Sequence, residues 1–215
     1  MITDSILNLL FPPKCTLCQK VLEKHETDLC HQCRIDSPEC AGLHKNFSFL
    51  DSWAAVWYYE GYIRDSLLRY KFCHARHYAP VYGRVLAMRI RQEYPDGFDC
   101  LTWVPVSRIR RFTRGYDQVE LLAEAVGKEL GMEPIPTLKK IRNNRPQSGI
   151  DGQAKRRANV LGVYRITDPE AVRGKRIVLL DDILTTGATA GECARVLLTA
   201  GAKEVHCAVI AAARK

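Results

Sequence analysis

The chain has 215 residues, with 32 Lys and Arg against 24 Asp and Glu, so its formal net charge is +8 at pH 7. That length allows one substantial hydrophobic core and a small appendage. The sequence has no run of 18 apolar residues, which excludes a membrane-spanning helix. Its positive charge indicates an acidic partner, such as a phosphorylated small molecule, a nucleic acid or a membrane surface.

Residues 1–11 are apolar but contain Asp4 and lack both a basic flank and a small-residue cleavage site. This pattern argues against a signal peptide. We expect a short helix packed on the body of a cytoplasmic protein.

Nine cysteines are present, and five of them lie in residues 15–40. Such crowding favours a metal site over disulfides. Two CxxC pairs, 11 residues apart, can face each other and hold one ion in a closed tetrahedral site. Zinc binding of about 10–16 kcal/mol would fold a segment with almost no core of its own, so we predict a structural role. The predicted ligands are Cys15, Cys18, Cys30 and Cys33.

Other uses of these cysteines stay open. Two disulfides conflict with the lack of an export signal, and redox chemistry lacks a thioredoxin-like pattern around the CxxC pairs. Cys40, His25 and His31 could substitute as ligands, although neither histidine has CxxC-like pairing.

A linker at residues 38–48 is expected to separate this segment from the rest, giving domains 1–45 and 46–215. Residues 53–59, rich in aromatic and small apolar residues, predict a strand. Helices are predicted from 63 to 72 and from 78 to 94, the second ended by Pro95 and Gly97. Between them, Cys73, His74 and His77 are interpreted as a plain connection, because no fourth metal ligand is near.

Residues 101–106 predict the next strand, followed by a loop over residues 107–115 that contains four arginines. Guanidinium groups match phosphate oxygens, so we expect this loop to bind a diphosphate, although a solvated charge run is the alternative. Asp117 and Glu120 should cap a helix that ends at Gly131. The candidate phosphate contacts here are Ser107, Arg108 and Arg114.

Residues 135–138 predict a short strand, and the basic stretch 139–159 is nearly devoid of apolar residues. A composition of this kind is typical of a mobile loop, either a spacer or a lid over a site.

Residues 177–189 combine an apolar strand (177–180), Asp181 and Asp182, and a loop of hydroxyls and small residues. Ligands of open α/β sheets bind outside the carboxyl ends of the strands. The loop opens a helix, whose free N–H groups and dipole suit a phosphate. Thr189 and Glu192 have capping-box spacing, and the helix should stop at Gly201. A last strand at 205–211 completes an alternation typical of a parallel α/β sheet.

This segment resembles the phosphoribosyl pyrophosphate (PRPP) signature of type I phosphoribosyltransferases. In that family two carboxylates hold the ribose 2′- and 3′-hydroxyls and a T-T-G-x-T loop wraps the 5′-phosphate. The resemblance implicates Asp181 and Asp182 as the catalytic carboxylates. A buried strand followed by an ordinary turn is the alternative. The implied phosphate loop consists of Thr185, Thr186, Gly187, Ala188 and Thr189.

Over nearly its full length the chain resembles the ComF/GntX family, in which an N-terminal zinc ribbon precedes a type I phosphoribosyltransferase domain. Three groups of residues carry the resemblance. The first is a Y-x-x-G-x-I-R segment with a lysine, matched by Tyr58, Gly61, Ile63, Arg64 and Lys71. The second is R-G-F-N-Q, which resembles Arg114, Gly115, Tyr116, Asp117 and Gln118. The third is the hood loop, which resembles Gln147, Arg156, Asn159, Gly162 and Tyr164.

The resemblance implies PRPP binding with Mg²⁺, with Lys71 among the phosphate contacts. The best-described members of the family serve natural competence, the uptake of single-stranded DNA across the inner membrane, with a translocating helicase on the cytoplasmic side. Association with that uptake machinery is therefore implied as well.

Two functions follow from these observations. In the first, the protein handles single-stranded DNA, with residues 53–59 and the basic loops as the track and PRPP as a regulatory or structural ligand. In the second, it is an active phosphoribosyltransferase of unknown acceptor, because the signature is intact. A zinc-ribbon scaffold with a vestigial pocket is a third possibility.

Overall fold

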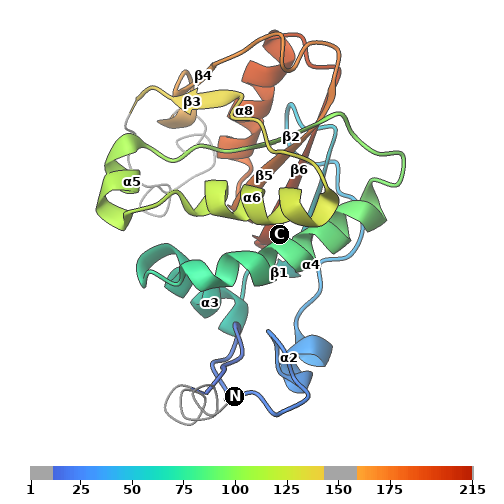
Figure 1. The fold of residues 1–215 in the computed structure, drawn as a ribbon. Helices are drawn as coiled ribbons and strands as arrows, with labels where there is room; N and C mark the ends of the chain where they lie inside the picture. Colours follow the sequence, from blue (N-terminus) through green and yellow to red (C-terminus); the bar gives the residue numbers. More distant parts are fainter. Residues whose placement is uncertain (1–11, 143–158, 215) are drawn as a thin grey trace.

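The computed structural model describes residues 12–142 and 159–214. Its centre is a four-stranded parallel sheet in the order β1-β6-β5-β2 (Figure 1). Long apolar runs form β5 and β6 because both faces of this sheet are covered. The predicted parallel α/β fold is confirmed. The strands are β1 (Ser52–Tyr58), β2 (Cys100–Trp103), β5 (Arg176–Leu184) and β6 (Glu204–Ala212).

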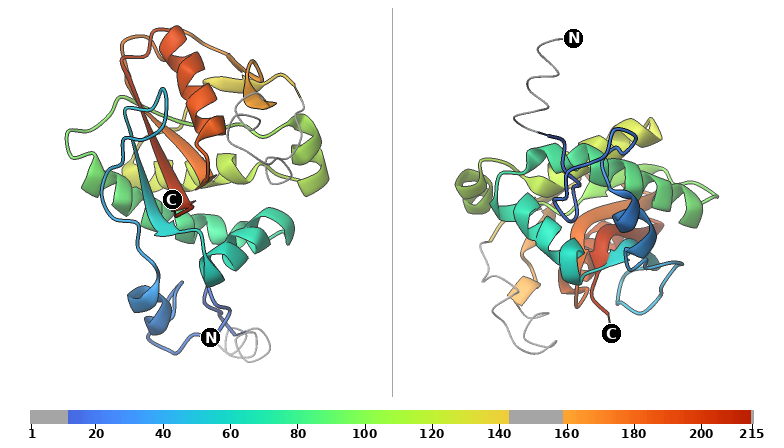
Figure 2. Two further views of the ribbon diagram at one scale, coloured as in Figure 1. Left: turned by 180° about the vertical axis from the view of Figure 1, so that it is seen from behind. Right: turned by 90° about the horizontal axis from the view of Figure 1, so that it is seen from below.

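Helices cover both faces of the sheet (Figures 1 and 2). One face packs against α4 (Ala79–Glu93) and α6 (Gln118–Leu130), together with α3 (Gly61–Phe72). The other face packs against α8 (Ala188–Thr199). A 3₁₀ turn, Arg76–Tyr78, links α3 to α4.

The N-terminal cysteine segment contains α2 (His31–Asp36) and packs against the α3 and α4 side of the body. Leu17 and Leu29 are buried in the same hydrophobic cluster as residues of α3 and α4. The hydroxyl of Ser66 donates to the carbonyl of Thr16 at 2.6 Å, and Arg84 forms an ion pair with Asp28. The segment is therefore docked on the helices of the larger part.

The predicted linker, residues 38–48, lies along the free edge of β1. Glu39 and His44 pair with Trp57 and Trp53 in isolated antiparallel bridges, and Cys40 is fully buried. This pairing covers an edge that would otherwise expose unpaired backbone groups.

Several predicted elements differ in the structure. The predicted arginine loop is instead mostly a short helix, α5 (Arg108–Arg114). The strand expected at 135–138 is β3 (Leu138–Lys140), which pairs antiparallel with β4 (Tyr164–Ile166) in a separate two-stranded sheet. Residues 1–11 and most of the basic stretch 139–159 lie outside the described residues.

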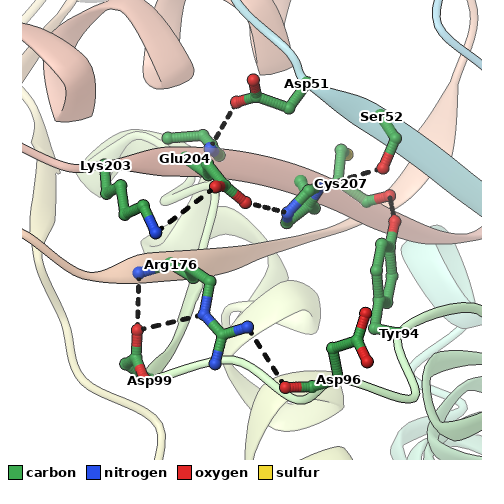
Figure 3. A network of polar contacts seen from close by, with 11 residues as sticks. Asp51, Ser52, Tyr94, Asp96, Asp99, Arg176, Lys203, Glu204 and Cys207 are labelled. Carbon is green, nitrogen blue, oxygen red and sulfur yellow. Dashed lines mark hydrogen bonds and ion pairs between the residues drawn. The ribbon is translucent and has the colours of Figure 1, made fainter.

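The amino ends of the strands are held by carboxylates (Figure 3). Asp51 accepts a hydrogen bond from the backbone N–H of Val205, and Asp99 accepts one from that of Arg176, both at 2.8 Å. Each carboxylate satisfies a donor that would otherwise be unpaired at the sheet edge. These contacts stabilise the amino ends of the strands, and the candidate site lies at their carboxyl ends.

Candidate functional site

Lys71, Asp182 and Gln118 meet at the carboxyl end of β5. The ammonium of Lys71 lies 2.8 Å from Oδ1 of Asp182, and the Gln118 amide donates to Oδ2 at 3.1 Å. The Asp182 side chain is 6% exposed and that of Lys71 is 18% exposed. A buried carboxylate needs such partners, since leaving its charge unpaired would be strongly destabilising.

The position of Gln118 follows from the start of α6. Asp117 is the N-cap of this helix, as predicted, and its carboxylate accepts from the N–H groups of Val119 and Glu120. It also accepts from the N–H of Val106, which follows β2, at 3.1 Å. The buried Asp117 side chain thus connects the end of β2 to the helix that presents Gln118. Its burial raises the pKa of the carboxyl group.

Asp181 is more exposed than Asp182 and has a different role. Pairing between β2 and β5 ends at Leu180, and the Asp181 carboxylate accepts the N–H of Asp182 at 2.8 Å. Burial of the group, together with the neighbouring Asp182 charge, raises the pKa of Asp181 above its ordinary value. A cationic or hydroxyl-bearing ligand would satisfy this carboxylate.

The strand that carries the aspartates is longer than the predicted 177–180, whereas the loop begins at Thr185 as expected. β5 continues through both aspartates to Leu184, because β6 pairs with it that far. Thr185 and Thr186 then lead to Gly187, the N-cap of α8 at φ +71°. A Cβ on Gly187 would lie 2.2 Å from the ring of Phe47, so only glycine fits beneath this ring.

The helix that follows begins at Ala188, so the N–H groups of its first turn, directly after the loop, have no partner within the helix itself. Thr189 therefore lies inside α8, and the predicted capping box with Glu192 is wrong. Glu192 instead accepts from the N–H of Gly162 at 2.8 Å and from the Arg195 guanidinium. An anion at this N-terminus would meet the positive end of the helix dipole.

Ser107 and α5 follow the end of β2. Ser107 is buried, and Arg111 forms a 3.1 Å ion pair with Glu120 at the start of α6. The side chains of Arg108 and Arg114 lie outside the described part of the structure. Their proposed phosphate contacts stay predictions.

The four predicted zinc ligands converge. Their sulfur atoms all lie within 4.8 Å of one another, and those of Cys18 and Cys30 are 3.6 Å apart. A tetrahedral Zn–S₄ site with bonds of about 2.3 Å has sulfur separations of about 3.8 Å, so this set can hold a metal ion such as zinc. In residues 12–142 and 159–214 no other group of His, Cys, Asp or Glu does so. The other candidates considered from the sequence do not form a cluster of possible metal ligands in the structure. They are Cys40, His25 and His31, and Cys73, His74 and His77.

The aromatic strand expected to contact DNA is in the core. Trp53 and Trp57 are 5% and 6% exposed, and Trp53 stacks on His44 with ring centroids 4.2 Å apart. The guanidinium of Arg214 covers the ring of Tyr58 at 4.1 Å. The two buried tryptophan rings therefore cannot stack on bases. The hood positions Gln147 and Arg156 lie outside the described residues.

Two residues near the site had no role assigned from the sequence alone. Gln118 at the first position of α6 could have been found, because it belongs to the segment Arg114–Gln118 that carries the family resemblance. Phe47 could not, since it lies in a segment that looks like a linker and reaches Gly187 only through tertiary packing.

Comparisons with known proteins agree with this geometry. The family model of the phosphoribosyl transferase domain matches residues 121–215. Competence protein ComFC of Bacillus subtilis (strain 168) is 27% identical over 188 residues, which cover 87% of this chain and 72% of that protein. Competence protein ComFC of Streptococcus pneumoniae is 29% identical over 205 residues, covering 94% and 82%.

A shorter match was found with DNA utilization protein YhgH of Salmonella typhi, 32% identical over 109 residues. It covers 50% of this chain and 47% of that protein. No helix in the described residues is long and apolar enough to cross a membrane. The chain thus matches the phosphoribosyl transferase domain over residues 121–215, is similar over most of its length to ComFC competence proteins, and has an N-terminal Cys₄ cluster consistent with a zinc ribbon.

Proposed function

We propose that this protein binds PRPP with Mg²⁺ at the carboxyl edge of its sheet and assists the handling of single-stranded DNA in natural transformation. The observation that carries the proposal is the arrangement at the end of β5, where two differently held carboxylates precede the N-terminus of α8. The likeness to proteins named for competence and DNA utilization supports the second part.

In this proposal the 5′-phosphate occupies the N-terminus of α8 and the ribose hydroxyls donate to Asp181 and Asp182. Each Asp182 oxygen already accepts one hydrogen bond and can accept another. Lys71 and Ser107 lie toward the diphosphate, and Mg²⁺, a hard cation suited to carboxylate and phosphate oxygens, neutralises part of its charge. The phosphate loop is Thr185, Thr186, Gly187, Ala188 and Thr189.

PRPP then acts as a regulatory or structural ligand, and the Cys₄ cluster holds a structural zinc. The partners are a translocating helicase and the uptake machinery on the cytoplasmic side of the inner membrane. Transfer to an unknown acceptor is the second candidate function, favoured by the presence of both carboxylates beside the anion-binding loop.

Helix α5 is the surface that we assign to single-stranded DNA. Its sequence, RIRRFTR, has four arginines and no acidic residue. Phe112 is 92% exposed and Ile109 is 60% exposed, and one turn of helix separates them. Single-strand binders combine cationic tracks with aromatic platforms on which bases stack. An almost fully exposed phenylalanine among arginines meets both requirements.

Fluorescence anisotropy with labelled oligo(dT) tests this assignment. We expect log K to fall linearly with log salt at a slope of about −0.7 per phosphate neutralised. Phe112→Ala should weaken binding roughly 5- to 160-fold at unchanged slope, because one stacked base contributes about 1–3 kcal/mol. Phe49→Ala, which removes another exposed phenylalanine (53%), should leave the affinity unchanged. Flat salt dependence, or equal affinities of Phe112→Ala and wild type, would rule out this surface.

A further inference from the structure

A cavity with a volume of about 540 Å³ lies on the α8 face of the sheet. Its walls come from β4, from the turn that precedes β5 and from the last two turns of α8. Three arginines and three apolar residues define its character: Arg165, Arg173, Arg195, Ile166, Pro169 and Val196.

This cavity is separate from the site at the end of β5. Val196 and Thr199 line it at the C-terminal end of α8, whereas the phosphate loop precedes the N-terminal end. At about 1.5 Å of rise per residue, the 12 residues of α8 place the two sites about 18 Å apart. One small ligand cannot occupy both.

The three guanidinium groups are not equally engaged. Arg165 forms no ion pair with any residue that the structure describes. Arg173 pairs with Glu170 at 2.8 Å, but both side chains are largely exposed, 66% and 75%, and such surface pairs contribute little. Two cationic groups are thus available to an incoming anion at small cost.

Arg195 is held in place instead. Its guanidinium donates two hydrogen bonds of 2.8 Å to the Glu192 carboxylate, which is 5% exposed. The same carboxylate accepts the N–H of Gly162, two residues before β4. The buried Glu192 carboxylate therefore joins one wall of the cavity, α8, to the segment that leads into the other wall, β4.

We propose that this cavity binds a nucleotide. The apolar surface of Ile166, Pro169 and Val196 suits a flat base, and the planar forks of Arg165 and Arg173 suit phosphate oxygens. The volume lies within the range of about 300–1,000 Å³ that is usual for small-molecule pockets. The phosphates then lie toward Arg165 and Arg173, and the base lies over Val196.

Calorimetric titration of the full chain with ADP, without Mg²⁺ or PRPP, tests this site. We expect one ADP bound with a dissociation constant below about 1 mM, and at least tenfold weaker binding in the double variant R165A/R173A. Arg91→Ala, an exposed arginine of α4 outside the cavity, is the matched control and should bind like wild type. Hydrogen exchange should slow in residues 159–166 and 195–201 when ADP binds.

The remaining outcomes separate this site from the proposed PRPP site. Asp181→Ala should retain ADP binding even if it loses PRPP, and loss of ADP binding in that variant would overturn the second site. Equal binding by R165A/R173A and wild type, or no binding at all, would also overturn it. Inorganic phosphate that binds as tightly as ADP would show that the cavity accepts anions without recognising a base, which contradicts the proposal.

Discussion

Asp181 and Asp182 are adjacent in the chain, but their carboxylates lie in different surroundings. Asp182 is buried and satisfied by Lys71 and Gln118. Asp181 has the raised pKa and no ammonium partner at hydrogen-bond distance among the described residues. The ionised form of Asp181 is therefore disfavoured in the free protein, and a ligand that donates a hydrogen bond to this carboxylate would stabilise it.

Replacement of Asp181 by asparagine should stabilise the protein without ligand. Burial and the Asp182 charge raise the pKa of Asp181 from 3.8 to about 8. A raised carboxyl pKa means that wild-type stability is full below about pH 4 and declines as the pH approaches 8. Each pKa unit corresponds to about 1.4 kcal/mol, so Asp181→Asn should gain at least ~1 kcal/mol over wild type at pH 8.

Urea denaturation at pH 4 and pH 8 measures this difference. The gain should be nearly absent at pH 4, where wild-type Asp181 is already protonated. An equal gain at both pH values would assign it to packing instead of charge. An Asp181→Asn variant less stable than wild type at pH 8 would show that the carboxylate is satisfied in the free protein.

At the scale of elements, glycine determines how closely α4 and α6 pack. A Cβ on Gly83 would lie 2.5 Å from Cβ of Ala125 and 2.9 Å from its carbonyl carbon. Backbone atoms cannot move aside as a flexible side chain would. This close approach holds α6, which carries Gln118, directly against α4.

Gly83→Ala should therefore destabilise the fold, by about 1–3 kcal/mol as overpacked core substitutions do. The gain in helix propensity of up to about 1 kcal/mol offsets part of this cost. The measurement is the urea midpoint of the variant, with Met88→Ala at an exposed position of the same helix as the control (55% exposed). A variant as stable as wild type would mean that the two helices separate at no cost.

The sequence was sufficient for the elements whose periodicity reflects burial. β6, α4 and α6 were predicted nearly at their observed bounds, because strands buried on two faces and amphipathic helices have clear patterns. β5 was predicted too short, because its pairing with β6 carries it past the two aspartates to Leu184. Helix α5 was missed because its apolar residues, Ile109 and Phe112, face solvent, so the segment lacks the apolar periodicity of a helix packed on a core. The position of β3 was misjudged because its pairing with β4 depends on a partner 26 residues later.

At the site, local motifs were predictable and long-range contacts were not. The cysteine cluster and the loop before α8 follow from spacing along the chain. Only a resemblance placed Lys71 at the site, as a phosphate contact, and its contact with Asp182, like the contacts of Gln118 and Phe47, needs the folded chain. The expectation that residues 53–59 contact DNA was wrong for Trp53 and Trp57, which are buried, because composition does not tell which strand of a sheet is covered.

For the whole molecule, the Cys₄ segment connects to the candidate site through α3. The hydroxyl of Ser66 and the guanidinium of Arg69 both donate to backbone carbonyls of this segment. Lys71 lies two residues beyond Arg69 on the same helix. The predicted boundary between domains 1–45 and 46–215 stays a prediction, but the two parts share one hydrophobic cluster.

Metal removal should therefore weaken both the fold and PRPP binding. A zinc chelator should lower the melting temperature by several degrees, since the cysteine segment has almost no core without its metal. PRPP affinity should fall as well, because the end of α3 loses its support. The same measurements on Cys73→Ser, an exposed cysteine outside the cluster, provide the control. Unchanged melting after verified zinc removal would show that the segment folds without metal.

Calorimetric titration of PRPP with Mg²⁺ tests the central claim most directly. We predict that wild type and Asp65→Ala, which alters an exposed carboxylate of α3, bind one PRPP with the same affinity. Asp181→Ala should show no measurable binding while remaining folded. Absence of binding to wild type, or equal affinities of Asp181→Ala and wild type, would contradict the claim that the end of β5 holds the sugar phosphate.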